Sequence, residues 1–157
     1  MNPNHSIQLQ FNSDPDILPG IRGMVVSLCE RFGFDEHEIG QIALAVDEAL
    51  ANVIRHGYES SADGMIWMQC RIIDSENPTL QVVIEDEGRQ VDGDQIQGRD
   101  LDDLKPGGLG VHIIREVMDK CEFETRAQKG MKLTLEKTAS PMGGLRTNAL
   151  QSEVGKE

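Results

Sequence analysis

A long amphipathic helix is the strongest structural signal in this sequence, and we expect it over residues 35–56. Asp35 followed three residues later by Glu38 is the pattern of a capping box, which opens a helix. Gly57 supplies a stop at the other end. Between these ends apolar residues return at helical spacing: Ile39, Ile42, Ala43, Val46, Ala49, Leu50 and Val53. A helix with one apolar side has to bury that side against another layer.

Hydrophobic periodicity in the rest of the chain predicts that this other layer is a β-sheet. We expect further helices at 21–32 and 109–119, and strands at 6–11, 65–73, 79–85, 121–126 and 131–136. Turn residues at 74–78 and 129–130 join the last four strands into two hairpins. This order of elements predicts an α+β fold. The expected form is a two-layer sandwich, in which a mixed, mostly antiparallel sheet carries helices on one face.

Two segments lack periodicity. Residues 88–108 are polar and are predicted to form one long loop, and loops of this length in compact domains are usually functional lids or disordered. Residues 138–157 hold Pro, Gly, Ser and Asn without a pattern and are predicted to be a disordered tail. We therefore expect one domain over residues 6–137.

The composition narrows the classes of partner and compartment. A net charge of −12 repels nucleic-acid phosphates and anionic lipids, so we expect no direct binding to nucleic acid or membrane. The same charge also serves solubility. The three cysteines are widely spaced, and neither a signal peptide nor an apolar run of membrane-spanning length is evident. These features predict a cytoplasmic protein.

Three polar side chains share one side of the predicted long helix. Glu48, Asn52 and His56 are spaced by four residues, and their side borders the apolar stripe. A carboxylate and an amide in this place can meet a ligand pressed against the helix, and hard oxygen donors suit Mg²⁺ with its phosphate partners. A solvated polar edge with a histidine near the negative end of the helix explains the spacing as well. On spacing alone this simpler interpretation is the stronger one.

A carboxylate is also predicted at the end of the strand at 79–85. Asp86 is in phase with the core residues of that strand, and a buried carboxylate costs several kcal/mol unless a donor pairs with it. A bound group with an N–H donor would pair with Asp86, and Gly88 permits close approach of a flat ligand. A turn aspartate bonded to local N–H groups is the alternative interpretation.

The third candidate is a run of glycines that leads into the helix at 109–119. The sequence Gly107-Gly108-Leu109-Gly110 would expose N–H groups and the positive end of the helix dipole to an anion. A flexible hinge is an equally fair interpretation of these glycines. No Walker A motif, zinc-protease motif or nucleophile elbow is present in the sequence.

These three patterns occur in an order that resembles the GHKL ATPase superfamily. The segment DEALANVIRHGY looks like its N box, IEDEGRQVD resembles its first glycine box, and GGLGVHIIREVMD is similar to its second. The resemblance spans Ile7 to Lys137. Within the superfamily the chain looks most like the small anti-sigma-factor serine kinases, which implies the Bergerat ATP-binding fold.

The resemblance implies a role for each matching residue, with ATP and Mg²⁺ as cofactors. Asn52 would coordinate Mg²⁺ between the ATP phosphates, and Glu48 would be the general base on the attacking hydroxyl. Asp86 would accept a hydrogen bond from the adenine amino group, and Gly88 would let the ring approach. The remaining implied elements are Gly108, Leu109 and Gly110 at the phosphates and Gln90 to Lys105 as the ATP lid.

Two positions depart from the family pattern. Gln90 stands where the first glycine box often carries a second glycine, which puts ATP binding mildly in doubt. Met131 follows Gly130 where a threonine is frequent near the adenine, so a water-mediated contact to the base is in doubt.

The resemblance implies a kinase that phosphorylates a Ser or Thr of an anti-anti-sigma protein of the STAS type, with a sigma factor as second partner. Related proteins tend to be dimers, which implies a homodimer, although no apolar stripe in this sequence demands one. A nucleotide-gated module that sequesters a regulator without phosphotransfer is the main alternative. A third is the ATPase part of a larger machine, whose additional domains we do not find in these 157 residues.

Overall fold

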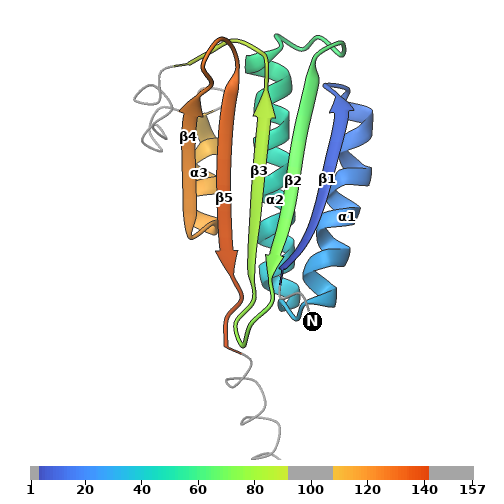
Figure 1. Cartoon of the computed structure of the whole chain (residues 1–157), viewed down its shortest axis with the longest axis vertical. Helices are drawn as coiled ribbons and strands as arrows, with labels where there is room; N and C mark the ends of the chain where they lie inside the picture. The colour runs from blue at the N-terminus through green and yellow to red at the C-terminus, as the bar shows by residue number, and fades with distance from the viewer. Residues whose placement is uncertain (1–3, 92–107, 142–157) are drawn as a thin grey trace, which may run out of the picture.

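The computed structural model describes residues 4–91 and 108–141, and the structural statements below concern these residues (Figure 1). The elements follow in chain order: β1 (Asn4–Asn12), the 3₁₀ turn η1 (Pro15–Ile17), α1 (Leu18–Arg31), α2 (Glu36–Asn52), the π-helical segment η2 (Val53–Gly57), β2 (Met65–Ile73), β3 (Thr79–Asp86), α3 (Gly108–Val117), β4 (Lys120–Thr125) and β5 (Met131–Thr138). The predicted strands, hairpins and helices are therefore all present.

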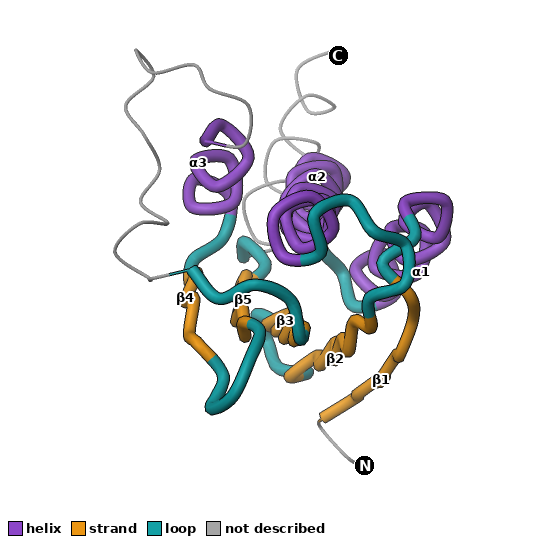
Figure 2. The backbone as a smooth tube through the Cα atoms, turned by 90° about the horizontal axis from the view of Figure 1, so that it is seen from above, coloured by secondary structure: helices purple, strands orange, loops and turns teal. Residues whose placement is uncertain are grey.

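The five strands form one sheet in the order β1-β2-β3-β5-β4, and every neighbouring pair is antiparallel. Seen from above, α1, α2 and α3 lie together on one side of this sheet (Figure 2). The two-layer α+β prediction is confirmed. The sheet described is antiparallel throughout, whereas we had expected a mixed one.

The core lies between the two layers because the sheet and the helices each have one apolar side. Alternate residues of β2 and β3 are buried, as a sheet with one covered face requires. The largest fully buried side chains come from both layers: Val25, Ile42, Val46, Leu50, Ile66, Met68, Ile72, Leu80, Val82, Ile84, Ile114 and Leu135. Each such aliphatic side chain contributes about 1.5–3 kcal/mol to stability when removed from water.

The helix ends follow the sequence signals with one difference, at the start of α1. The capping box at α2 is formed, since the Glu38 N–H donates to Asp35 Oδ1 over 2.7 Å and the Asp35 N–H donates to Glu38 Oε2 over 3.2 Å. Gly33, with φ of 86°, follows the end of α1, close to the predicted end at residue 32. However, α1 begins at Leu18 rather than residue 21, because Pro19 is tolerated in the first turn.

The edges of the fold differ more from the prediction. Ile7 in β1 is 37% exposed, and burial along this edge strand is found only at Leu9 and Phe11, although the His5 ring contacts Phe32 at the end of α1. At the other end, Ala139 is buried and its N–H donates to the Pro78 carbonyl over 2.8 Å. The Ser140 N–H and hydroxyl donate to Glu38 Oε1 over 2.8 and 2.6 Å. Packing thus continues past residue 137, and the rest of the predicted tail, 142–157, lies outside the described residues.

Candidate functional site

The polar side of α2 meets the first turn of α3. A Cβ atom built on Gly110 would lie 2.5 Å from Glu48 Oε2 and 3.6 Å from Asn52 Nδ2, so the α3 backbone passes directly over these two side chains. The structure therefore brings together three residues that the sequence had separated into two motifs. Only a glycine allows this approach without moving the Glu48 carboxylate.

Asn52 has an unusual hydrogen-bonding state. Its Oδ1 atom is buried and has no partner within the described ranges. An unpaired buried acceptor costs about 1–3 kcal/mol, so native proteins rarely keep one without a functional reason. The amide nitrogen is the Asn52 atom near Gly110, and the buried oxygen without a donor is of the hard type that suits a cation such as Mg²⁺.

The helix beyond Asn52 winds differently from the prediction. Residues 53–57 form a π-helix, a rare form that is frequent at functional sites. Because its hydrogen bonds run from i to i+5, each residue turns through a smaller angle than in an α-helix. His56 is exposed in this segment, and no contact between it and Glu48 or Asn52 is found among the described residues.

Arg55 is the residue of this segment that reaches Glu48. Its Nη2 atom lies 3.9 Å from Glu48 Oε2, and its Nε donates to the Ala51 carbonyl over 3.4 Å. The side chains of Arg55 and Glu48 are 46% and 29% exposed, so the pair contributes at most about 1 kcal/mol. The sequence analysis did not assign Arg55, although its spacing of seven residues from Glu48 puts both on one side of a helix.

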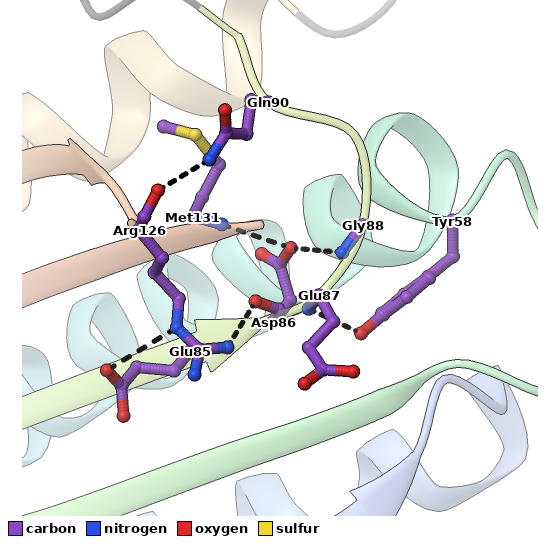
Figure 3. A network of polar contacts seen from close by, with 8 residues as sticks. All are labelled: Tyr58, Glu85, Asp86, Glu87, Gly88, Gln90, Arg126 and Met131. Atoms are coloured by element: carbon purple, nitrogen blue, oxygen red, sulfur yellow. Dashed lines mark hydrogen bonds and ion pairs between the residues drawn. The ribbon is translucent and has the colours of Figure 1, made fainter. Parts of the chain in front are cut away.

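Asp86 lies at the end of β3 with its side chain buried among N–H donors (Figure 3). Its Oδ1 atom accepts hydrogen bonds from the Gly88 N–H over 2.8 Å and from the Met131 N–H over 3.3 Å. No hydrogen bond to Oδ2 is found in the described part of the chain. The carboxylate is thus held through one oxygen, as a turn aspartate would be, and its other oxygen is available to a ligand.

Burial dominates the electrostatics of this carboxyl group. Desolvation raises the pKa of Asp86, while the N–H groups of Gly88 and Met131 and the charge of Arg126 oppose that rise. The net pKa lies above the usual aspartate value. A raised pKa in a ligand-facing carboxyl is common at functional sites.

Glycines surround Asp86 because backbone segments pass close to it. A Cβ on Gly88 would lie 2.4 Å from the Gly57 carbonyl oxygen, so Gly88 is required by contact with the end of η2. The sequence argument had attributed this glycine to ligand approach. Gly130, with φ of 82°, lies against the Asp86 carbonyl, where a Cβ would be 1.8 Å away. A Cβ on Gly57 would lie 3.7 Å from Asp86 Oδ1.

Side chains that the sequence analysis had not assigned fix the segment after β3. The Tyr58 hydroxyl donates to the Met65 carbonyl and accepts from the Glu87 N–H over 2.7 Å. The Arg126 Nη1 donates to the Asp86 carbonyl over 2.6 Å (Figure 3). Tyr58 closes the N-box-like segment in the sequence, whereas Arg126 had no sequence signal beyond a lone positive charge after a strand.

One continuous helix joins the two halves of the site, the half around Glu48 and Asn52 and the half around Asp86. The first two residues lie on α2, and its continuation η2 ends at Gly57 beside Asp86. Gly108 and Leu109 lie in the first turn of α3, and the side chain of Leu109 lies outside what is described. Of the predicted lid, Gln90 to Lys105, only its first two residues belong to the described ranges. At one end of the site lie the Glu48 carboxylate, the Asn52 amide and the start of α3. At the other end lies the buried Asp86 carboxylate.

Comparison with known protein families identifies this arrangement. The family of histidine kinase-like ATPase domains matches residues 11–137, a range that includes all of α2, β3 and α3. The chain belongs to this family. A histidine kinase-like ATPase domain binds ATP, so the polar end of α2 and the buried carboxylate of β3 lie in an ATP-binding fold.

Relatives of this histidine kinase-like domain carry regulatory names. The chain is 27% identical over 140 residues to the serine-protein kinase RsbW of Bacillus subtilis, covering 84% of this chain and 83% of that protein. It is 30% identical over 137 residues to the anti-sigma F factor of Heyndrickxia coagulans, covering 85% and 92%. Both relatives therefore match over most of their length.

A solved structure supports the fold. The RsbU and RsbW domains of a Mycobacterium tuberculosis protein match with a TM-score of 0.62 at 15% identity, covering 87% of this chain and 33% of that one. The chain thus spans about a third of that longer protein, and the likeness concerns the fold alone. Across the described residues, none of the helices has the length and apolar character that crossing a membrane requires.

Proposed function

We propose that this protein is an ATP-dependent serine/threonine kinase and anti-sigma regulator. Its substrate would be a Ser or Thr of an anti-anti-sigma protein of the STAS type in a partner-switching system, and a sigma factor would be its second partner. The names and coverage of the relatives support this class. The observation that carries the proposal is the contact of Gly110 with Glu48 and Asn52, where the buried Asn52 oxygen has no partner in the described structure.

The base of the nucleotide belongs at the end of β3 in this proposal. Asp86 accepts a hydrogen bond from the adenine amino group through Oδ2, while Gly88 and Met131 hold Oδ1. The carboxylate is buried, so a donor from the base removes part of its desolvation cost. A base that presents an acceptor in place of the amino group meets an unfavourable contact there.

The phosphates belong at the other end, between α2 and the start of α3. Gly108, Leu109 and Gly110 offer N–H groups at a helix start, which favours negative charge. Asn52 Oδ1 would hold Mg²⁺, since it is a buried hard donor without a partner among the described side chains. When bound, the magnesium ion supplies positive charge against the charge that develops on the transferred phosphoryl group.

In this proposal Glu48 acts on the attacking hydroxyl. Its carboxylate lies over Gly110, next to the phosphate-facing backbone, and takes the hydroxyl proton of the substrate. The hydroxyl oxygen forms a bond to the γ-phosphorus as the bond from that phosphorus to the bridging oxygen of ADP breaks. A positioned general base contributes about 10²–10⁴-fold to such a reaction.

A nucleotide-gated binding module is the second candidate, and the Arg55–Glu48 pair favours it. Arg55 lies 3.9 Å from Glu48 Oε2 and so occupies the carboxylate that a kinase needs as a proton acceptor. A protein that sequesters a regulator without phosphotransfer has no need of that acceptor. Both candidates bind ATP in the same place. They differ in whether phosphate leaves the nucleotide.

Phosphotransfer distinguishes the two. Purified protein is incubated with radiolabelled Mg-ATP and each STAS-domain protein of the same organism, and label on the substrate is followed with time. The kinase proposal expects label on a Ser or Thr of one of them. Nucleotide binding by this protein with no label on any of these substrates would favour the binding module instead.

A further inference from the structure

One residue outside the predicted motifs, Arg126, links the end of β3, the segment that follows it and the β4–β5 turn on the Asp86 side of the site (Figure 3). It follows β4, and its N–H donates to the Gly130 carbonyl over 3.0 Å, which closes the turn to β5. Its Nη1 donates to the Asp86 carbonyl over 2.6 Å. Its own carbonyl accepts from Gln90 Nε2 over 2.6 Å.

The guanidinium group reaches Asp86 from the face of the sheet that carries no helix. Its Nε lies 3.9 Å from Glu85 Oε1, and its Cζ lies 5.5 Å from the ring centre of Trp67. Glu85 and Trp67 are cross-strand partners, and both alternate with residues that face the helices. Arg126 therefore holds the Asp86 main chain from one face while the carboxylate points to the other.

The ladder between β3 and β5 explains why this contact is needed. The pairing ends at Glu85 with Lys132, so the Asp86 carbonyl lies past the last pair. Gly130 lies against that carbonyl and leaves space for the arginine to donate to it. Without Arg126 the end of β3 would lose the side-chain donor that fixes it to the β4–β5 turn.

Gln90 ties the next residues of the chain to the same turn. It stands where the family pattern often has a glycine, and a glycine could not donate the hydrogen bond to Arg126. Lys129 Nζ lies 3.1 Å from Glu87 Oε2 and adds a second link between the turn and this segment. Residues 86–90 are thus attached to one turn at both ends.

We propose that Arg126 is a positioning residue that aims the Asp86 carboxylate and so sets the preference for adenine over guanine. This inference rests on the proposed binding of ATP at Asp86. A carboxylate accepts from the amino group of adenine and is repelled by the carbonyl oxygen of guanine, and that difference depends on where the carboxylate points. A loosened strand end would reduce the preference and leave phosphate binding intact.

The charges around Asp86 support the same assignment. Tyr58, Glu85, Glu87 and Lys129 are among the described titratable groups around Asp86 and Arg126, and the charge of Arg126 lowers the pKa of Asp86 against the effect of burial. Removing the guanidinium would raise that pKa further. The lower limit of pH for ATP binding would then move upward.

The test compares Arg126→Ala and Arg126→Lys with Arg71→Ala, a matched control in which an exposed arginine of β2 is removed. Affinities for Mg-ATP, Mg-GTP and inorganic triphosphate are measured by calorimetry at several pH values. We expect Arg126→Ala to lose roughly tenfold in ATP affinity, as one charge-assisted hydrogen bond predicts. GTP and triphosphate affinities should stay at the parent values, and Arg71→Ala should match the parent throughout.

The lysine variant keeps the positive charge without the planar fork and should recover only part of the preference. If Arg126→Ala proves too unstable to measure, Gln90→Ala tests the same turn and should give a smaller loss in the same direction. An unchanged ratio of ATP to GTP affinity in Arg126→Ala would overturn the inference, as would an equal loss for ATP, GTP and triphosphate. A parent protein that shows no preference for ATP would instead contradict the placement of the base at Asp86.

Discussion

The two halves of the site are prepared to different degrees. At the base-facing half, Asp86 Oδ1 has two N–H donors, its carbonyl has Arg126, and the neighbouring Glu87 N–H has Tyr58. At the phosphate-facing half, the buried Asn52 Oδ1 has no partner within the described ranges. The fold therefore fixes the Asp86 carboxylate through one oxygen and leaves only the other to a ligand, whereas the described structure gives the Asn52 oxygen no partner at all.

The strongest test of the phosphate-facing half is replacement of Glu48, the proposed general base. We expect Glu48→Gln to lower phosphotransfer by about 10²–10⁴-fold, because the amide cannot take the hydroxyl proton. ATP affinity should stay close to the parent value. Glu36→Gln makes the same change at the exposed start of the same helix and should leave the rate unchanged. A fully active Glu48→Gln protein would show that another group is the base.

In the base-facing half, Asp86→Asn separates binding from stability. The variant should lose about 10- to 100-fold in ATP affinity, since it replaces a charged acceptor with an amide. Calorimetry with Mg-ATP measures this loss, and triphosphate affinity is the internal control.

The same variant should change the pH dependence of stability. Because burial raises the folded-state pKa of Asp86, the native protein keeps this proton at pH values where the unfolded chain has released it. The stability from this group is therefore full below the ordinary aspartate pKa and is lost as the pH rises through the folded-state pKa. Asp86→Asn should remove that loss, so its free energy of unfolding at neutral pH should equal or exceed the parent value. Urea unfolding across the acidic range measures it, and a large destabilisation at neutral pH would contradict the assignment.

Two glycines sharpen the comparison, because they face different kinds of neighbour. Gly130→Ala forces a Cβ against the Asp86 carbonyl at positive φ and should lower the free energy of unfolding by at least about 2 kcal/mol. Gly110→Ala meets only the end of the flexible Glu48 side chain, so it should stay folded and lose phosphotransfer. Gly40→Ala, with open space at an exposed helix position, should stabilise by up to about 1 kcal/mol. If Gly130→Ala and Gly110→Ala lowered the free energy of unfolding equally, the two halves of the site would not differ in the way described.

A modest effect is expected of Tyr58→Phe. The change removes a hydroxyl that both donates to the Met65 carbonyl and accepts from the Glu87 N–H. We expect a loss of about 1–2 kcal/mol in the free energy of unfolding. ATP affinity should change less than it does in Asp86→Asn. Chemical denaturation beside an ATP titration checks both expectations.

Local patterns predicted the fold and the place of the main site residues because each rests on short-range signals. The capping box of Asp35 and Glu38 formed as expected, and the in-phase position of Asp86 placed its carboxylate inward at the end of β3. Gly110 was expected at a helix start, and that is where it lies.

What the sequence could not reveal depends on contacts between distant segments. The π-helical segment after Asn52, which carries Arg55 and ends beside Asp86, has no simple sequence signature. Arg126 and Gln90 acquire their roles only when the β4–β5 turn lies beside the end of β3. Ile7 fits an alternating pattern and is still exposed, because helix packing covers only part of the edge strand.

The most direct measurement is a calorimetric titration of the purified protein with Mg-ATP, run beside Asp86→Asn and Asn52→Ala. We predict that the parent binds, that Asp86→Asn binds far more weakly, and that Asn52→Ala loses the dependence on Mg²⁺. An absence of binding by the parent at millimolar ATP, or parent-like binding by both variants, would contradict a nucleotide site between α2, α3 and the end of β3.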